Sequence, residues 1–241
     1  MEYYCITDIG LLREKNQDSY LAITNGYGDF LALVADGIGG GKAGEVASGE
    51  TIKYFEFAFK DSGPFSAPED VISYLNFHIS SVNRHIHDLS RKYAEYEGMG
   101  TTLTGIMITK HGTVSINCGD SRVYGFIDDL VVHLTKDHTL VNQMFDNGEI
   151  SFTETLNHPK RHYLVKAIGV YGECEADVHK VKDMDYYLIC SDGLHSYVSD
   201  KEIQQIVVDR EKTVQEKTED LKDMALMKGG YDNVTVILVK A

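Results

Sequence analysis

The sequence predicts an α+β fold in which antiparallel strands and pairs of helices are stacked in layers. Two long segments near the N-terminus have apolar residues every three or four positions, and capping boxes indicate two more helices near the C-terminus. Between these pairs, residues 101–135 change to a period of two with short turns, which is typical of antiparallel strands. Together these patterns favour sheets packed on each other with helix pairs outside. Three prolines and no linker or repeat favour one compact unit over residues 1–241.

The first half of the chain supplies strands and then a helix pair. Residues rich in Tyr, Ile, Leu and Val predict strands at 2–8, 19–24 and 29–35, and glycines mark the turn between the last two. Helices are predicted over 43–60 and 68–93. The longer helix has apolar residues along one face: Ile72, Leu75, Ile79, Val82, Ile86 and Leu89.

The second half alternates strands with shorter helices. Strands are predicted at 102–109, 112–118, 121–127, 130–134, 176–181, 185–191 and 233–239. A helix is expected near 138–147, and residues 148–172 are expected to be irregular. Ser199 with Glu202, and Thr213 with Glu216, form the capping boxes of the second helix pair, and Gly229-Gly230 end its last helix.

Composition excludes two classes of partner. The formal net charge of −14 argues against nucleic acid, whose affinity comes largely from Lys and Arg on phosphates. No apolar run approaches the roughly 20 residues of a membrane helix. Met1-Glu2-Tyr3-Tyr4 lacks the basic, apolar start of a signal peptide. We therefore expect a cytoplasmic, monomeric protein that binds neither nucleic acid nor membrane.

The four cysteines do not form a metal-binding pattern. Cys5, Cys118 and Cys190 lie in apolar, strand-like runs, and neither they nor Cys174 form a C-x-x-C pair. We expect small buried side chains that stay reduced, and the spacing does not support a zinc site.

Five aspartates stand at the ends of the predicted strands. Each could cap a turn on its own, since Asp-Gly pairs are common there. If these strand ends converge, however, the carboxylates repel one another unless a cation neutralises them. Oxygen ligands suit Mg²⁺ and Mn²⁺, and clustered carboxylates can bridge two such ions for attack of a water on phosphorus. The five are Asp18, Asp36, Asp120, Asp192 and Asp232.

Six motifs in fixed order resemble the metal-dependent, type 2C Ser/Thr protein phosphatases in their compact bacterial form. The resemblance extends from about Thr7 to Val239. The motifs are Gly10-Leu11-Leu12-Arg13-Glu14-Lys15-Asn16-Gln17-Asp18-Ser19, Ala35-Asp36-Gly37-Ile38-Gly39-Gly40, Gly98-Met99-Gly100-Thr101-Thr102, Gly119-Asp120-Ser121-Arg122, Ser191-Asp192-Gly193-Leu194 and Gly230-Tyr231-Asp232-Asn233-Val234-Thr235.

The resemblance implies a four-layer α/β/β/α sandwich with a binuclear Mn²⁺ or Mg²⁺ site at one end. Asp36 would bridge the two ions, and the carbonyl of Gly37 would join the second. Asp192 and Asp232 would complete the first, while Asp18 would hold metal-bound water. Arg13 would grip the phosphate of a phosphoserine or phosphothreonine protein, a task suited to its rigid donor fork. Residues 139–168 match a variable flap.

Two positions depart from the family pattern. Gln17 stands where some members place an acidic residue, which weakens one expected water contact. Ile38 stands where some members carry a His proposed to protonate the leaving alkoxide. A third metal held by Asp120 with help from Asp192, as in bacterial members, would supply that proton from bound water. His138, His158 and His162 are other candidates, although each fits a surface histidine.

Other interpretations remain open on the sequence alone. Gly39-x-Gly41-x-x-Gly44 fits a dinucleotide fingerprint, but residues 51–60 would then have to be a parallel strand. A catalytically dead relative could serve as a binding module, although its metal-binding aspartates are all present. The enzyme could also serve one regulator, such as an anti-sigma-factor antagonist, or counteract a cognate Ser/Thr kinase.

Overall fold

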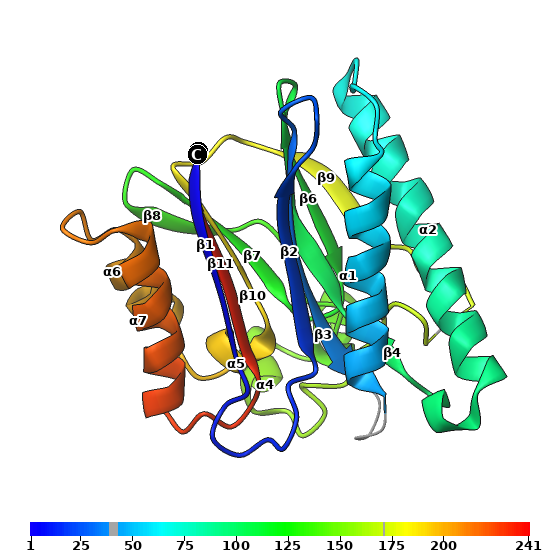
Figure 1. Cartoon of the computed structure of the whole chain (residues 1–241). Coiled ribbons are helices and arrows are strands. Elements are labelled where there is room, and N and C mark those ends of the chain that lie inside the picture. The colour runs from blue at the N-terminus through cyan, green and yellow to red at the C-terminus, as the bar shows by residue number, and fades with distance from the viewer. Residues whose placement is uncertain (39–42, 171) are drawn as a thin grey trace.

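Two antiparallel sheets packed face to face form the middle of the molecule, with helices on their outer faces (Figure 1). The structure is a computed structural model that describes residues 1–38, 43–170 and 172–241. One sheet has the strand order β1-β11-β10-β7-β8 and the other β2-β3-β5-β6-β9, with β4 paired to β3. The predicted α+β class, with two antiparallel sheets and flanking helix pairs, is confirmed.

The strands and helices have the following bounds. The first sheet contains β1 (Glu2–Asp8), β11 (Val234–Lys240), β10 (Tyr186–Cys190), β7 (Arg122–Ile127) and β8 (Leu130–His133). The second contains β2 (Asp18–Thr24), β3 (Phe30–Ile38), β4 (Gly100–Thr101), β5 (Leu103–Thr109), β6 (Gly112–Cys118) and β9 (Asp177–Val181). The helices are α1 (Gly44–Lys60), α2 (Pro68–Lys92), the 3₁₀ turn η1 (Ala94–Tyr96), α3 (Leu140–Asp146), α4 (Phe152–Asn157), α5 (Asp192–His195), α6 (Asp200–Val207) and α7 (Val214–Met227).

Strict alternation along the central strands creates three hydrophobic cores. Successive side chains of a strand point to opposite faces, so a strand buried on both sides supplies two cores. In β3 one face packs between the sheets and the other against the α1–α2 pair. The same division in β11 separates the inter-sheet core from the core under α6 and α7. The inter-sheet set of β3 is Phe30, Ala32 and Val34, and its helix-side set is Leu31, Leu33 and Ala35.

The helices cover the sheets as their periodicity predicts. Leu75, Ile79 and Ile86 of α2 are buried in the core that α1 and α2 share with the second sheet. On the other side, the capping boxes at Ser199 and Thr213 begin α6 and α7, and each Glu three residues later accepts the cap N–H. Gly229 and Gly230 follow α7 with positive φ angles, as expected of a helix end.

The structure corrects the prediction in the segment expected to be irregular. Residues 148–172 contain the helix α4, which begins with a capping box between Ser151 and Glu154. The expected helix near 138–147 is reduced to α3. The short helix α5 and the short strand β4 were not predicted. All four elements are too short to display a hydrophobic period, which is the main signal for secondary structure in a sequence.

The structure also contradicts the dinucleotide interpretation. That interpretation required a parallel strand at 51–60, whereas these residues belong to α1. Gly39 and Gly41 of the fingerprint, and Gly40 of the adjoining motif, lie outside the described residues. Among the helices that the structure describes, none is both long and apolar enough to cross a bilayer.

We predict that side chains on the core face of α2 contribute to the free energy of unfolding and that those on its outer face do not. Leu75 is fully buried, so Leu75→Ala leaves a cavity and should lower the free energy of unfolding by about 2–5 kcal/mol. Phe77, two residues along the same helix, has 65% of its surface exposed, and Phe77→Ala should change it by less than about 0.5 kcal/mol. Urea unfolding of both variants measures the difference, and equal losses would contradict the assignment of these faces.

Candidate active site

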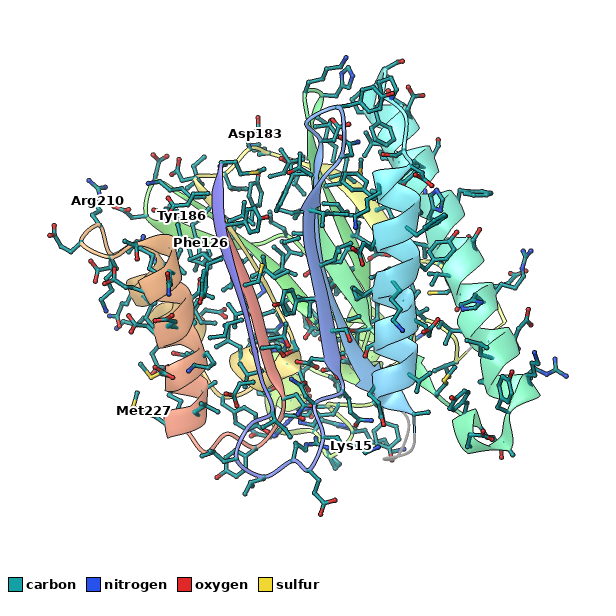
Figure 2. The ribbon with its side chains drawn as sticks, viewed as in Figure 1. Lys15, Phe126, Asp183, Tyr186, Arg210 and Met227 are labelled. Atoms are coloured by element: carbon teal, nitrogen blue, oxygen red, sulfur yellow. The ribbon has the colours of Figure 1, made fainter. Side chains whose placement is uncertain are left out.

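Four of the predicted aspartates meet at one end of the sandwich because four strand ends meet there. Asp18 begins β2 and is paired directly with Asp36 in β3. Asp192 follows β10 and Asp232 precedes β11, the neighbouring strand of the facing sheet. Lys15, in the loop before β2, marks this end at the bottom of Figure 2. The two sheets therefore bring together carboxyl groups that lie far apart in the sequence.

Asp18 links the two sheets through its carboxylate. Its Oδ2 accepts hydrogen bonds from the hydroxyls of Ser191 and Thr235, each at 2.7 Å. Both donors belong to the facing sheet, since Ser191 follows β10 and Thr235 lies in β11. Ser191 and Thr235 were not predicted as site residues, and their only signal was their position in motifs around Asp192 and Asp232.

Asp36 is held in place by hydrogen bonds of its backbone. Its N–H donates to Thr102 Oγ1 at 2.9 Å, and its carbonyl accepts from Thr101 Oγ1 at 2.9 Å. The next residue must be glycine because there is no room for a side chain: a Cβ at Gly37 would lie 2.2 Å from the carbonyl oxygen of Gly44. The close approach of β3 to the start of α1 thus requires the Asp-Gly pair that the sequence displays.

Arg13 is paired with Asp232 in this structure. Its Nη2 donates to Asp232 Oδ2 at 2.6 Å, and its side chain is about half exposed. Asn233 fixes the loop that carries Arg13 by donating to the carbonyls of Ile9 and Lys15 and accepting from the N–H of Gln17. Asn233 is a residue that sequence reasoning missed as a member of the site.

Asp120 is buried beside two histidines that hold its loop. His195, which the sequence analysis missed, donates from Nε2 to the carbonyl of Asp120 at 2.9 Å. The N–H of Gly119 donates to His138 Nδ1 at 3.2 Å, and His138 Nε2 then donates to Asp177 at 3.1 Å. The sequence favoured a surface histidine at position 138, and this is wrong because its side chain is 9% exposed. His162 is exposed as expected, and His158 is half-buried.

Burial and mutual repulsion raise the pKa values of four carboxyl groups at this end. Burial is the largest cause in each case, and the neighbouring carboxylates add to it. The pKa of Asp18 is raised to about 6 despite its two hydroxyl donors, and that of Asp120 to about 7. The pKa values of Asp36 and Asp192 are raised well above their usual range. The protein therefore disfavours the charged cluster unless positive charge is supplied.

The residues present fit divalent cations. In the described part of the chain, Asp18 Oδ1 and Asp192 Oδ1 are buried and meet no hydrogen-bond donor of the protein's amides, hydroxyls or bases. The charges of Asp18 and Asp192 raise the pKa of Asp36, so without a cation these neighbouring carboxyl groups favour keeping protons. A hard cation would replace such protons, because carboxylate oxygens are its preferred ligands.

In the part of the chain that the structure describes, acidic side chains do not complete a metal site on their own. Within the described ranges, no three His, Cys, Asp or Glu side chains form a group that could hold a metal ion. Mg²⁺ keeps several waters and is held by one or two carboxylates, so water and backbone carbonyls would supply the remaining ligands. The Arg13–Asp232 ion pair also occupies one of the candidate ligands.

Two surface hollows lie away from the aspartates. One, of about 310 Å³, is lined by residues including Phe126, Tyr186 and Arg210. The other, of about 570 Å³, is lined by residues including Lys110 and Asp183. Figure 2 places Phe126, Tyr186, Arg210 and Asp183 at the end opposite Lys15. Neither hollow contains a predicted site residue, so charge and not cavity volume marks the candidate active site.

Comparison with known proteins identifies the family. The family model described as protein phosphatase 2C matches residues 13–226, which include Arg13 and four of the five aspartates. The chain belongs to the protein phosphatase 2C family. Members of this family depend on metal ions, in general Mn²⁺ or Mg²⁺. This phosphatase is accordingly a metal-dependent protein-serine/threonine phosphatase that acts on phosphoproteins.

Bacterial relatives match the phosphatase over nearly its whole length. The serine/threonine phosphatase stp of Listeria innocua is 35% identical over 236 residues, covering 97% of this chain and 93% of that protein. The protein phosphatase PhpP of Streptococcus pneumoniae is 35% identical, with 99% and 97% covered. The crystal structure of Stp1 from Staphylococcus aureus superposes with a TM-score of 0.93 at 32% identity, covering 100% and 94%.

We predict that the metal-free phosphatase loses stability as pH rises from about 4 to 7. The folded-state pKa values of Asp18 and Asp120 lie above the ordinary value, so the folded protein binds protons that the unfolded chain has released. Stability is then fully present below about pH 4 and lost as pH rises through the folded pKa values, by on the order of 5 kcal/mol. Unfolding in EDTA at several pH values measures this slope.

The control for that slope removes one titrating group. Asp18→Asn should flatten the fall between pH 4 and 6, because its amide carries no proton to lose. Saturating Mn²⁺ should remove the fall in the unmodified protein by stabilising the charged folded state. An Asp18→Asn slope equal to that of the unmodified protein would contradict the assigned pKa.

Proposed function

We propose that the phosphatase hydrolyses phosphoserine and phosphothreonine at a binuclear centre held by the aspartate cluster. Asp36 would bridge the two ions, with Asp192 and Asp232 on the first and the carbonyl of Gly37 on the second. Asp18 would hold water on the centre through the oxygen that lacks a donor. The observation that carries this assignment is the convergence of four buried carboxyl groups whose pKa values are raised together.

The protein's own groups divide the work of the reaction. Mn²⁺ or Mg²⁺, when bound, would activate a water for in-line attack and neutralise charge on the phosphoryl oxygens. Asp36 and Asp192 would position that centre, because their backbones are fixed at the ends of β3 and β10. Ser191 and Thr235 would keep Asp18 oriented by donating to its other oxygen.

Arg13 would bind the substrate phosphate. Its guanidinium now neutralises Asp232, and its exposed position at the cluster allows it to turn to an anionic substrate once cations neutralise the acid. A planar fork of donors matches the oxygens of a phosphate better than a lysine does. Asn233 supports this role because it holds the loop on which Arg13 stands.

Asp120, with Asp192, would hold a third cation that serves the leaving group. Ile38 cannot donate a proton, so the alkoxide of serine or threonine needs another acid. A cation at Asp120 would lower the pKa of its water and supply that proton. The location supports this assignment, since the charge of Asp120 is the largest electrostatic contribution to the raised pKa of Asp192.

Residues 139–168 would form a flap that influences substrate choice within the single catalytic domain. The segment contains α3 and α4, and its ends are tied by the bridge between Thr139 and Leu164 and by the bond from the N–H of Leu140 to Tyr163. We expect a monomer in the cytoplasm whose phosphoprotein substrates are set by a cognate Ser/Thr kinase. An inactive binding module would have no need of the buried carboxyl cluster.

The metal requirement gives the first test. With Mn²⁺ or Mg²⁺ the protein should cleave para-nitrophenyl phosphate and phosphothreonine peptides, and EDTA should stop both reactions. Asp36→Asn should lower kcat by about three orders of magnitude or more, because it removes the bridge between the ions. Glu14→Gln, an exposed change in the nearby loop, is the control and should retain activity. Full activity in EDTA or in Asp36→Asn would refute the binuclear centre.

The role of Arg13 is tested by the split between kcat and KM. If Arg13 binds the phosphate equally in the ground and transition states, Arg13→Ala should mainly raise KM. A charge-assisted contact of roughly 1.5–3 kcal/mol predicts a loss of about ten- to a hundredfold in kcat/KM. Lys15→Ala is the matched control, because Lys15 pairs with Glu45 on α1. Unchanged kinetics in Arg13→Ala on a phosphopeptide would show that Arg13 is only a surface residue.

The role of Asp120 is tested by comparing leaving groups. Asp120→Ala should keep the fold and two tightly bound ions, which metal analysis after gel filtration can count. Its kcat should fall most for phosphothreonine peptides, whose alkoxide needs a proton, and little for para-nitrophenyl phosphate, whose leaving group departs unprotonated. Equal losses on both substrates with the two ions retained would count against this assignment.

A further inference from the structure

Two cysteines lie in direct contact beside the active-site end of the second sheet. The Sγ atoms of Cys118 and Cys174 are 2.8 Å apart, although 56 positions separate the residues in the sequence. Cys118 is the last residue of β6, and Cys174 lies three residues before β9 begins. None of the chemistry described above uses either thiol.

The sheet register explains why the two sulfurs meet. β6 and β9 are antiparallel neighbours in which Asn117 faces Asp177. Cys118 therefore continues one strand at the point where Cys174 approaches the other. Both side chains also turn to the same side, since Cys118 is buried in the core under α1 and α2 and Cys174 packs against that core. The contact thus follows from the fold and not from a chance encounter of two loops.

The distance between the sulfurs is short enough for a covalent bond. A disulfide joins sulfurs at about 2.0 Å, so about 0.8 Å of movement would close the gap. Cys174 provides that movement because it lies in the connection between residue 172 and β9 and is only half-buried. The fold therefore holds the two thiols in contact, whereas in the unfolded chain a long loop would separate them.

The surroundings divide the two thiols into an attacking and a resolving partner. Cys174 is the half-buried sulfur, and its pKa is lowered by the hydrogen bond with Cys118 and by the charge of Lys166. Cys118 is fully buried behind it. Burial instead raises the pKa of Cys5 to about 12 and raises that of Cys190, so these thiols are poor nucleophiles by comparison.

We propose that Cys118 and Cys174 form an oxidation site at which hydroperoxides produce a reversible disulfide. The Cys174 thiolate attacks the hydroxyl oxygen of the peroxide, the O–O bond breaks, and hydroxide leaves from hydrogen peroxide or an alkoxide from an organic hydroperoxide, which gives the sulfenic acid Cys174–SOH. The Cys118 sulfur then attacks Cys174 Sγ, an S–S bond replaces the S–O bond, and water leaves with the Cys118 proton. The pair loses two electrons and the peroxide gains them; a dithiol such as dithiothreitol reverses the reaction.

The disulfide would close a covalent ring around a functional part of the phosphatase. The ring contains Asp120 and the whole of residues 139–168. A cross-link stabilises a protein by restricting the unfolded chain, and the effect grows with the length of the closed loop. A ring of this size should raise Tm by roughly 5–15 °C in a protein of this length.

Treatment of the full chain with a small excess of hydrogen peroxide tests the site. Free thiols counted after denaturation should fall from four to two per chain, and the intact mass should fall by about 2 Da. Trypsin digestion without reductant should yield one linked product of residues 111–122 and 167–180, which carry Cys118 and Cys174 respectively. Dithiothreitol should restore all four thiols and the lower Tm.

Single substitutions separate this pair from the other cysteines. Cys174→Ser should keep its three remaining thiols at the same peroxide dose, and Cys5→Ser should still lose two. If Cys118→Ser does not fold, because that residue is buried, Cys174→Ser alone decides. Retention of four thiols in the unmodified chain, or links that join other cysteines or two molecules, would overturn the proposal. A linked chain that melts no higher than the reduced one would also contradict it, since the sulfurs would then not be placed for the bond.

Discussion

Repulsion among buried carboxylates at one end of the sandwich is the constraint on which the rest of the structure depends. Burial desolvates four of these carboxyl groups, those of Asp18, Asp36, Asp120 and Asp192. The charges of Asp18 and Asp120 raise the pKa values of both Asp36 and Asp192. A protein can keep such a group only by protonating it, pairing it with bases or binding cations. Among the described residues, Arg13 pairs with Asp232 at the exposed edge, and Arg122 beside Asp120 is already paired with Asp137. The cluster is therefore unfavourable by itself and favourable as a cation site.

Three apolar cores, packed away from the site, offset the unfavourable free energy of the carboxyl cluster. The alternation in β3 and β11 anchors both sheets along their length, so their ends can carry polar groups. Hydrogen bonds from Ser191 and Thr235 to Asp18 then fix the spacing of the sheets at the site. Close backbone approaches complete the geometry: a Cβ at Gly193 would lie 2.0 Å from the carbonyl oxygen of Asn233. The packing of the three cores therefore stabilises the fold enough to hold carboxyl groups that repel one another.

Structural features that repeat along the chain could be predicted from the sequence, whereas features that depend on a single contact could not. The period of two, the long face of α2 and the capping boxes repeat a signal over many residues, so the layers and most element bounds were predictable. The aspartates were predictable as a set because all stand at strand ends. Asn233, Ser191 and His195 were not, since an isolated polar residue looks the same whether it holds a loop or faces water. The 2.8 Å contact of Cys118 with Cys174 depends on the register of two strands, which no local pattern encodes.

Titration of Mn²⁺ into the metal-free phosphatase, followed by electron paramagnetic resonance, tests the central claim most directly. A carboxylate that bridges two ions holds them about 3.5–4 Å apart, close enough for their spins to couple. The unmodified protein should therefore give a spin-coupled Mn²⁺ signal, and Asp36→Asn should lose the coupling while it stays folded. Bound ions that are magnetically isolated in the unmodified protein, or a failure to bind Mn²⁺, would contradict the account.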